Sequence, residues 1–262
     1  MVKLIASDLD GTLLQNGLTE VSDRAIDLIK KLHEYGVIFA PASGRQLSGL
    51  RRLFSPVADN LVYICLNGAY VKYRNEVIYK EAMNREKCIE LLKNIKERKE
   101  CGFLLYTEEV SYTMADNDIY SESVKDDIKN DYICINDFDE IKGDILKISI
   151  YHKGETEILK DYLSEKFDGE FKVTVSGKHF IDVVSKDVNK GKSLQKVKER
   201  FNIETDFAMC FGDSYNDLEM FDVVYFSYAM THSDSEIRKK ARYLTGNVED
   251  ILYDVFKMLE LG

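Results

Sequence analysis

The chain has 262 residues and a formal net charge of −10 at neutral pH, and its length allows one or two domains. This acidic balance argues against a nucleic-acid-binding protein, which needs a basic face. An anionic substrate must therefore be attracted by a local cation or basic side chain, because the overall field repels it. No apolar run reaches the length of a membrane-spanning helix, so we expect no membrane partner.

Five scattered cysteines are never spaced as Cys-x-x-Cys, and most of them lie within apolar stretches. This usage predicts reduced, buried thiols rather than a disulfide framework or a metal cluster. Asp8 interrupts the first apolar run, which therefore lacks the uniform core of a signal peptide. We accordingly expect a cytoplasmic protein.

The first strand is predicted at residues 4–6, and two carboxylates follow it, Asp8 and Asp10. Residues two apart in an extended chain point to the same side, so both carboxylates would face one space. Two like charges held that close need a cation or a shared proton at neutral pH. Gly11 supplies the sharp turn that follows, and Thr12 can hydrogen-bond the loop closed. An ordinary acidic turn explains the same stretch when it stands alone.

Short apolar strands alternate with helices as far as residue 66. Ser22 is a candidate N-cap for the first helix, and Gly36 ends that helix. This alternation is typical of a parallel sheet covered on both faces, in which sites lie at the carboxyl ends of the strands. Three polar residues follow such ends: Asp8, Ser43 and Asn67. The predicted helices are residues 22–35 and 46–54, and the predicted strands are residues 37–40 and 61–66.

Hairpins mixed with helices characterise the middle of the chain, which predicts an α+β unit with a mainly antiparallel sheet. One hairpin covers residues 71–79 and turns at Asn75, and another turns around Gly177. Residues 116–144 are polar and acidic and support no firm prediction. The predicted helices are residues 84–98 and 155–167, and the predicted strands are residues 103–106, 110–114, 145–151, 171–176 and 180–184.

The parallel pattern returns after Lys190. Asn247 is a candidate N-cap for the last helix, whose apolar residues recur along one side. The middle unit therefore resembles an insertion into the first domain. The predicted helices here are residues 191–201 and 248–261, and the predicted strands are residues 207–211 and 223–228.

Two short stretches could bind a phosphate group. Ser43, Gly44 and Arg45 offer a hydroxyl and free backbone N–H groups near a helix start, which is a natural phosphate cradle. A helix cap explains these three residues equally well when they stand alone. Lys190 immediately precedes a predicted helix, but most lysines are merely solvated, so by itself it indicates no site.

Three oxygen-bearing side chains gather after the strand at residues 207–211: Asp213, Asn216 and Asp217. A turn with an N-cap is the alternative explanation. Carboxylate and amide oxygens with no histidine or cysteine nearby suit a hard cation, and the predicted ion is Mg²⁺.

These motifs, in this order, resemble those of the haloacid dehalogenase superfamily, specifically the Cof-like phosphatases with a large α/β cap. The resemblance spans the whole chain and implies an α/β fold. A Rossmann-like parallel-sheet core would comprise residues 1–82 and 185–262, and an inserted α+β cap for substrate specificity would comprise residues 83–184. The resemblance rests on Asp8-Leu9-Asp10-Gly11-Thr12, Ser43-Gly44-Arg45, Asn67-Gly68-Ala69, Lys190-Gly191 and Gly212-Asp213-Ser214-Tyr215-Asn216-Asp217.

By this resemblance, Asp8 would be the nucleophile that attacks phosphorus and forms an aspartyl-phosphate. Asp10 would act as the general acid for the leaving alcohol and then as the general base for the hydrolytic water. Mg²⁺ would be held by an Asp8 side-chain oxygen, the Asp10 backbone carbonyl and the Asp213 carboxylate. Asn216 and Asp217 would be additional metal ligands or would orient the other ligands.

The resemblance also implies which residues contact the substrate. Ser43, Gly44 and Lys190 would bind the phosphoryl oxygens and offset the charge that builds there. The cap would close over the substrate and exclude water. The predicted substrate-binding residues are Arg45, Asn67 and His179, and the further cap candidates are Lys178 and Tyr112. His179 is equally well explained as an ordinary histidine at a strand edge.

One loop departs from the family pattern. Cof-like proteins carry Ala-Met-Gly-Asn-Ala after the strand that follows the acidic motif, whereas residues 229–233 here are Ala-Met-Thr-His-Ser. Because that loop borders the site in the family, the change predicts a difference in substrate scope or rate.

The predicted function is a Mg²⁺-dependent phosphomonoesterase that acts on small phosphorylated metabolites such as sugar phosphates, with nucleotide-like and flavin phosphates as further candidates. We expect a monomer or a weak homo-oligomer. Two alternatives stay open: a phosphomutase of the same superfamily, and a catalytically weak phosphate-ester-binding protein. Only the change at Thr231 and His232 supports the second alternative, and the intact Asp10 argues against it because binding alone needs no acid or base.

Overall fold

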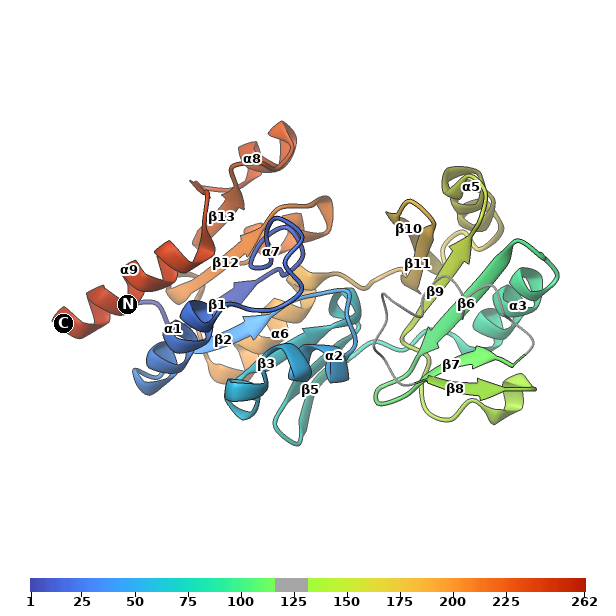
Figure 1. Cartoon of the computed structure of the whole chain (residues 1–262), viewed down its shortest axis with the longest axis horizontal. Helices are drawn as coiled ribbons and strands as arrows, with labels where there is room; N and C mark the ends of the chain where they lie inside the picture. The colour runs from blue at the N-terminus through green and yellow to red at the C-terminus, as the bar shows by residue number, and fades with distance from the viewer. Residues whose placement is uncertain (116–131) are drawn as a thin grey trace. The chain divides into compact units, whose positions relative to one another are not determined.

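The computed structural model describes residues 1–115 and 132–262 and divides the chain into two compact units (Figure 1). Unit 1 comprises Met1–Tyr79 and Asn189–Gly262, and unit 2 is Lys80–Val188. The chain therefore leaves unit 1 once and returns to it once. Part of the stretch without a firm prediction, residues 116–131, lies outside the described residues.

A five-stranded parallel sheet organises unit 1, with the strand order β14-β13-β12-β1-β2. All four residues of β1 are buried, because strands on both sides and helices on both faces cover it. The predicted Rossmann-like parallel core is thereby confirmed. The strands are β1 (Leu4–Ser7), β2 (Ile38–Pro41), β12 (Ala208–Gly212), β13 (Phe226–Met230) and β14 (Tyr243–Thr245).

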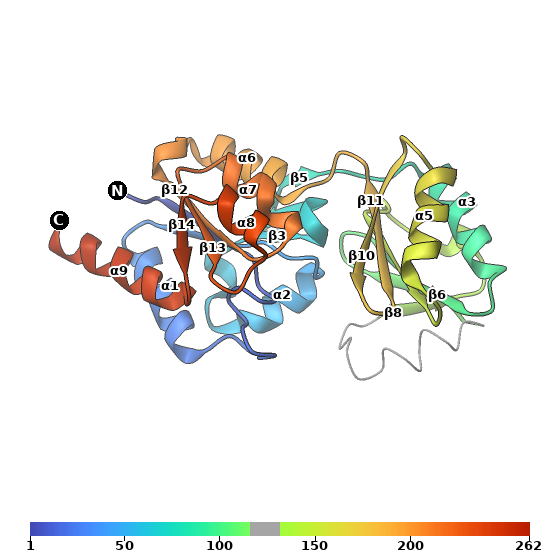
Figure 2. The same ribbon diagram turned by 90° about the horizontal axis from the view of Figure 1, so that it is seen from above.

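Helices cover the two faces of this sheet. α1 (Asp23–Glu34) and α9 (Val248–Leu261) lie together on one face, and α6 (Lys190–Phe201) and α7 (Leu218–Asp222) lie together on the other (Figure 2). Successive strand residues point to opposite faces, so a strand between two helix layers must be apolar throughout. The remaining helices of unit 1 are α2 (Leu47–Leu53) and α8 (Ser235–Lys240).

The predicted helix caps form in unit 1. The Ser22 hydroxyl accepts a hydrogen bond from the Ala25 N–H at the start of α1, and the Asn247 side chain accepts one from the Glu249 N–H at the start of α9. α1 and α9 therefore begin within one residue of their predicted positions, because the cap is a local interaction that the sequence shows directly.

The predicted strand at residues 61–66 forms as β3 (Val62–Cys65), but it belongs to a separate sheet. It pairs antiparallel with β4 (Tyr70–Tyr73), which pairs with β5 (Glu76–Lys80) in the predicted hairpin. Its link towards β2 is a parallel bridge between Ala42 and Ile64. A tight turn separates β3 from β4, and only antiparallel strands can be joined that closely.

Among the residues that the structure describes, four short α-helices and β-strands are not predicted by the sequence pattern: α7, α8, β14 and β8 (Tyr132–Ile135). Each has between three and six residues, which is too short for a period to show. The strand predicted at residues 223–228 begins later, as β13, because the loop that follows α7 occupies residues 223–225.

The described residues of unit 2 include a six-stranded sheet, ordered β10-β11-β9-β6-β7-β8, and the α-helices α3 and α5. Neighbouring strands of this sheet pair antiparallel, except β7 with β8, which are parallel, so the prediction of a mainly antiparallel α+β unit is confirmed. The elements are α3 (Arg85–Lys96), β6 (Cys101–Tyr106), β7 (Ser111–Met114), β9 (Lys147–His152), α5 (Thr156–Lys166), β10 (Phe171–Gly177) and β11 (Phe180–Ser185).

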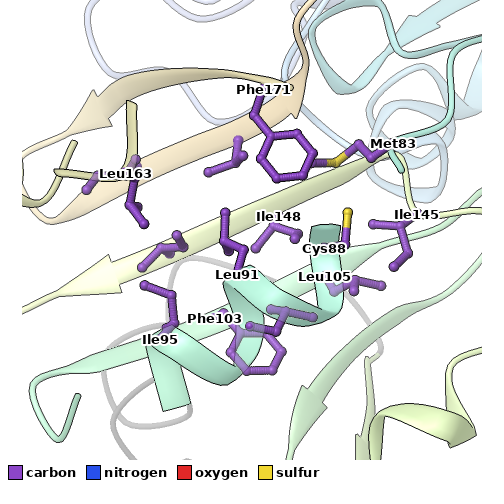
Figure 3. Packing of buried hydrophobic residues seen from close by; sticks show 14 of the residues in the cluster. Met83, Cys88, Leu91, Ile95, Phe103, Leu105, Ile145, Ile148, Leu163 and Phe171 are labelled. Carbon is purple, nitrogen blue, oxygen red and sulfur yellow. The ribbon is translucent and has the colours of Figure 1, made fainter. Parts of the chain in front are cut away.

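The core of unit 2 lies between its helices and one face of its sheet. Leu91 and Ile95 of α3 pack towards Phe103 and Leu105 of β6, and Ile148 of β9 joins them (Figure 3). Tyr112 also belongs to this core, and its hydroxyl accepts a hydrogen bond from the Lys142 N–H (3.4 Å). The prediction of Tyr112 as a substrate-contact residue is therefore corrected, because its side chain packs in the core of unit 2.

The described part of the chain contains no helix that is both long and apolar enough to cross a membrane. The prediction that most cysteines are buried thiols is confirmed for four of the five. The exception is Cys134, which is exposed on the edge strand β8. The buried thiols are Cys65, Cys88, Cys101 and Cys210.

Helix α6 approaches α7 so closely that Gly191 has room only for a hydrogen atom, because a Cβ there would overlap the Glu219 carbonyl. We predict that Gly191→Ala lowers the free energy of unfolding by about 1–3 kcal/mol, since the helices must separate. Urea denaturation measures this change. Gly246→Ala is the control, because its Cβ would meet the Thr231 hydroxyl at an ordinary 3.7 Å. Equal destabilisation by both variants would contradict the prediction.

Candidate active site

The carboxyl ends of β1 and β12 bring the two acidic motifs together. Ser7 at the end of β1 pairs with Phe211 of β12, so the loops that follow these two strands start side by side at the same edge of the sheet. The Asp8 N–H donates to the Phe211 carbonyl (3.0 Å). Carboxylate oxygens of three aspartates then lie within 4.8 Å of one another: Asp8, Asp213 and Asp217.

Lys190 supplies the positive charge of this cluster. It is the first residue of α6, and its ammonium donates to Asp8 Oδ1 (2.5 Å) and to Asp217 Oδ1 (2.7 Å). Only 1 % of its side chain is exposed. Burial acts to lower the pKa of Lys190, but the Asp217 and Asp8 carboxylates outweigh burial and raise the pKa. Lys190 is therefore a permanent cation at neutral pH.

The cluster contains more carboxylates than ammonium groups, so its charges do not cancel. Burial raises the pKa of Asp8 to about 8, the Lys190 ammonium acts against this rise, and Asp217 and Asp213 add to it. Three carboxylates with one ammonium leave a formal charge of −2 when all are ionised. A divalent cation matches this excess, and carboxylate oxygens are the ligands that Mg²⁺ prefers. The residues present therefore fit a magnesium ion.

Asp213 is held by a residue from the first loop. The buried Thr12 hydroxyl donates to Asp213 Oδ1 (2.7 Å). Burial raises the pKa of Asp213, and this hydrogen bond partly opposes the rise. Thr12 is predicted to close its own loop, whereas in the structure its hydroxyl joins the two acidic loops. No local pattern reveals a contact between residues so far apart in the chain.

Asp217 accepts hydrogen bonds on both of its oxygens. Oδ1 accepts from Lys190, and Oδ2 accepts from the N–H groups of Asp213 and Ser214 (both 3.0 Å). The side chain is fully buried. Of the two roles that the sequence leaves open, orienting the other groups fits this geometry better than direct metal binding, because these donors already occupy its oxygens.

Asn216 contacts the loop after β3. Its side-chain N–H donates to Asn67 Oδ1 (3.4 Å), so two residues predicted for different roles lie side by side. Gly44 lies next to the same Asn67 amide, and a Cβ at position 44 would stand 3.0 Å from its oxygen. The loops that follow β2, β3 and β12 therefore meet at Asn67.

Asp10 and Arg45 form an ion pair at the edge of this cluster. The Arg45 guanidinium donates through Nε to Asp10 Oδ2 (3.1 Å) and through Nη2 to Asp10 Oδ1 (2.5 Å). Both side chains are more than one-third exposed. A bidentate guanidinium holds a carboxylate in one orientation, which water alone would not do. Arg45 therefore contacts the predicted acid–base residue directly.

Ser43 is buried and precedes α2 by several residues. Its N–H donates to the Ile64 carbonyl (2.9 Å), and its hydroxyl accepts from the Arg45 N–H (3.3 Å). The N-cap of α2 is Gln46, so the explanation of Ser43 as a helix cap is wrong.

The remaining predicted residues lie in other surroundings. His179 contacts the His152 carbonyl through Nδ1 (3.3 Å) within unit 2, and Lys178 is exposed there. In unit 1, the Thr231 N–H donates to the Thr245 carbonyl, which joins the loop after β13 to β14. His232 in that loop contributes to lowering the pKa of Asp213, against the larger effect of burial.

Comparisons with known proteins agree with this architecture. A family profile described as haloacid dehalogenase-like hydrolase matches residues 5–252. The chain is 24 % identical over 262 residues to the 5-amino-6-(5-phospho-D-ribitylamino)uracil phosphatase of Escherichia coli, with 99 % of this chain and 97 % of the relative covered. It is 28 % identical over 247 residues to a phosphoglycolate phosphatase of Staphylothermus marinus, covering 94 % and 92 % of the two chains.

A solved structure shares the fold over nearly the whole chain. The crystal structure of TM0651 from Thermotoga maritima superimposes with a TM-score of 0.82 at 28 % identity, covering 98 % of this chain and 97 % of that one. The matching profile covers all of unit 2 and most of each part of unit 1. The chain therefore belongs to the haloacid dehalogenase-like hydrolase family and is a phosphatase.

Proposed function

We propose that this phosphatase is a Mg²⁺-dependent phosphomonoesterase that hydrolyses small phosphorylated metabolites through a phosphoryl-aspartate on Asp8. The observation that carries the proposal is the buried cluster in which Lys190 contacts both Asp8 and Asp217 while Asp213 lies within reach of Asp8. The family relatives named for phosphoglycolate and for a phosphoribitylamino-uracil support a small, polar phosphate ester as substrate.

The metal-binding groups of the proposal are an Asp8 side-chain oxygen, the Asp10 backbone carbonyl and the Asp213 carboxylate, with Asn216 as an additional ligand or a residue that orients the others. When bound, Mg²⁺ would offset the negative charge of the phosphoryl group. Thr12 holds Asp213, and Asp217 fixes the backbone of the Asp213 loop, so these two residues keep the ligands in place.

In the first step, an Asp8 oxygen attacks phosphorus and the bond from phosphorus to the ester oxygen breaks. The leaving oxygen takes a proton from Asp10. In the second step, water attacks the phosphorus of the phosphoryl-aspartate and gives its proton to Asp10, while the bond between phosphorus and the Asp8 oxygen breaks. Inorganic phosphate is released, and the Asp8 carboxylate is restored. Ser43, Gly44 and Lys190 bind the phosphoryl oxygens in both steps.

The inserted unit is proposed to select the substrate, in keeping with its prediction as a cap at residues 83–184. His179 and Lys178 are its candidate contact residues. A cytoplasmic location and a monomeric or weakly oligomeric state complete the proposal.

The nucleophile is tested by Asp8→Asn, which removes the negative oxygen that attacks phosphorus. We predict that phosphate release falls by at least about 1,000-fold, because no other group can form the covalent bond. Steady-state phosphate release from a sugar phosphate measures it. Asp234→Asn is the control, since asparagine caps α8 as well as aspartate does and activity should not change. Undiminished turnover by Asp8→Asn would exclude the mechanism.

The role of Arg45 is tested with two leaving groups. We predict that Arg45→Ala slows hydrolysis of an alkyl phosphate by about 10- to 100-fold, because Asp10 loses its fixed orientation for proton donation. Hydrolysis of p-nitrophenyl phosphate should fall much less, since nitrophenolate leaves without a proton. Arg51→Ala is the control, as its guanidinium also pairs with an exposed aspartate, Asp59. Equal losses with both esters would mean that Arg45 acts on the phosphoryl group instead.

Metal dependence is tested by removal and by direct binding. We predict that EDTA abolishes phosphate release and that added Mg²⁺ restores it. Isothermal titration should show that Asp213→Asn weakens Mg²⁺ binding by at least about tenfold, because a charged ligand becomes neutral. Asp206→Asn, in the short turn before β12, is the control and should bind Mg²⁺ as the wild type does. Full activity in EDTA would contradict the prediction.

A further inference from the structure

Three consecutive residues after β3 have a left-handed backbone. The φ angles are 53° at Leu66, 58° at Asn67 and 102° at Gly68. Glycine adopts this conformation freely and asparagine tolerates it, but leucine meets a steric penalty there. A strained backbone persists only where its surroundings hold it, and such strain gathers at functional sites. The contacts that hold this turn therefore indicate what it does.

Two backbone hydrogen bonds attach the turn to the loop that carries Ser43. The Leu66 N–H donates to the Arg45 carbonyl (3.1 Å), and the Asn67 N–H donates to the Ser43 carbonyl (3.0 Å). Both bonds come from left-handed residues and reach the same short loop. A relaxed backbone at Leu66 and Asn67 would turn these N–H groups elsewhere, so the strained conformation helps to hold the Ser43 loop, in addition to the bond from the Ser43 N–H to the Ile64 carbonyl.

A second set of contacts attaches the turn to the start of α6. The Ser193 hydroxyl donates to the Gly68 carbonyl (2.5 Å), and Ser193 is fully buried. Gly68 also lies directly against the Asn189 backbone, since a Cβ there would stand 2.5 Å from the Asn189 carbonyl oxygen. Asn189 caps α6, and Lys190 is the first residue of that helix. These contacts therefore fix the backbone position from which the Lys190 side chain extends.

We propose that the turn Leu66–Gly68 sets the spacing between the Ser43 hydroxyl and the Lys190 ammonium, and that Ser193 and Asn67 are positioning residues for phosphoryl transfer. Ser193 acts through the Gly68 carbonyl, and Asn67 acts through its bonds to the Ser43 loop and to Asn216. This inference rests on the proposed function, in which Ser43 and Lys190 bind the phosphoryl oxygens.

Two variants test the proposal. Ser193→Ala removes the donor to Gly68, and Asn67→Gly keeps the left-handed backbone while it removes the bond to Asn216. We expect each to lower kcat/KM by at least about tenfold, because small displacements of positioned groups have large effects on rate. The loss should be equal for an alkyl phosphate and for p-nitrophenyl phosphate, and the inhibition constant for inorganic phosphate should rise.

The controls are matched in burial and backbone conformation. Ser227→Ala removes another buried hydroxyl of unit 1, which accepts from the Arg242 N–H (3.1 Å). Asn202→Gly replaces another left-handed asparagine, at the opposite end of α6 from Lys190. Both controls should keep kcat/KM within about twofold of the wild type, and the free energy of unfolding of Ser193→Ala should fall no further than that of Ser227→Ala.

The outcomes separate this inference from the proposed function. An active wild type whose Ser193→Ala and Asn67→Gly variants stay within twofold of it would overturn the inference and leave the function standing. Loss of stability without a change in phosphate inhibition would show a merely structural role and would also overturn it. A wild type that neither hydrolyses the two esters nor binds inorganic phosphate would overturn both.

Discussion

The contact on which the site depends is the buried ammonium of Lys190 between the carboxylates of Asp8 and Asp217. Removing such charges from water costs several kcal/mol for each ion, and only close partners offset the cost. Asp217 is held in turn by two backbone N–H groups of the loop after β12. The start of α6, the end of β1 and the loop after β12 are therefore joined by charge, and no one of them can shift without leaving another charge unpaired.

The sheet makes this contact possible. β1 pairs in parallel with β12 although unit 2 and α6 lie between them in the chain. Because parallel neighbours present their carboxyl ends at one edge, the acidic loops meet whatever the length of the insertion. Two glycines then allow neighbouring segments to pack closely, which fixes the position of α6. Gly191 lets α6 contact α7, and Gly68 lets the turn after β3 contact Asn189, the N-cap of α6.

The strongest sequence predictions concern interactions within a few residues. The caps at Ser22 and Asn247, the apolar strands on both sides of the insertion and the acidic run after β12 all have local causes, so the sequence displays them directly. Contacts between loops have no such signature. Nothing near Thr12 indicates that it holds Asp213, and nothing near Ser193 indicates that it holds the carbonyl of Gly68. Those pairs depend on packing between segments that are distant in the chain.

By itself, the sequence determined the family, the alternation of strands and helices and the residue types available for chemistry, because these follow from local spacing and from the order of the motifs. Only the tertiary structure decided which partner each side chain has. It separated β3 from the parallel sheet, gave Asp217 three donors and paired Arg45 with Asp10. The physical reason is that hydrogen bonds and ion pairs form between whichever groups the folded backbone brings within about 3 Å, and that proximity is a property of the assembled sheets and helices.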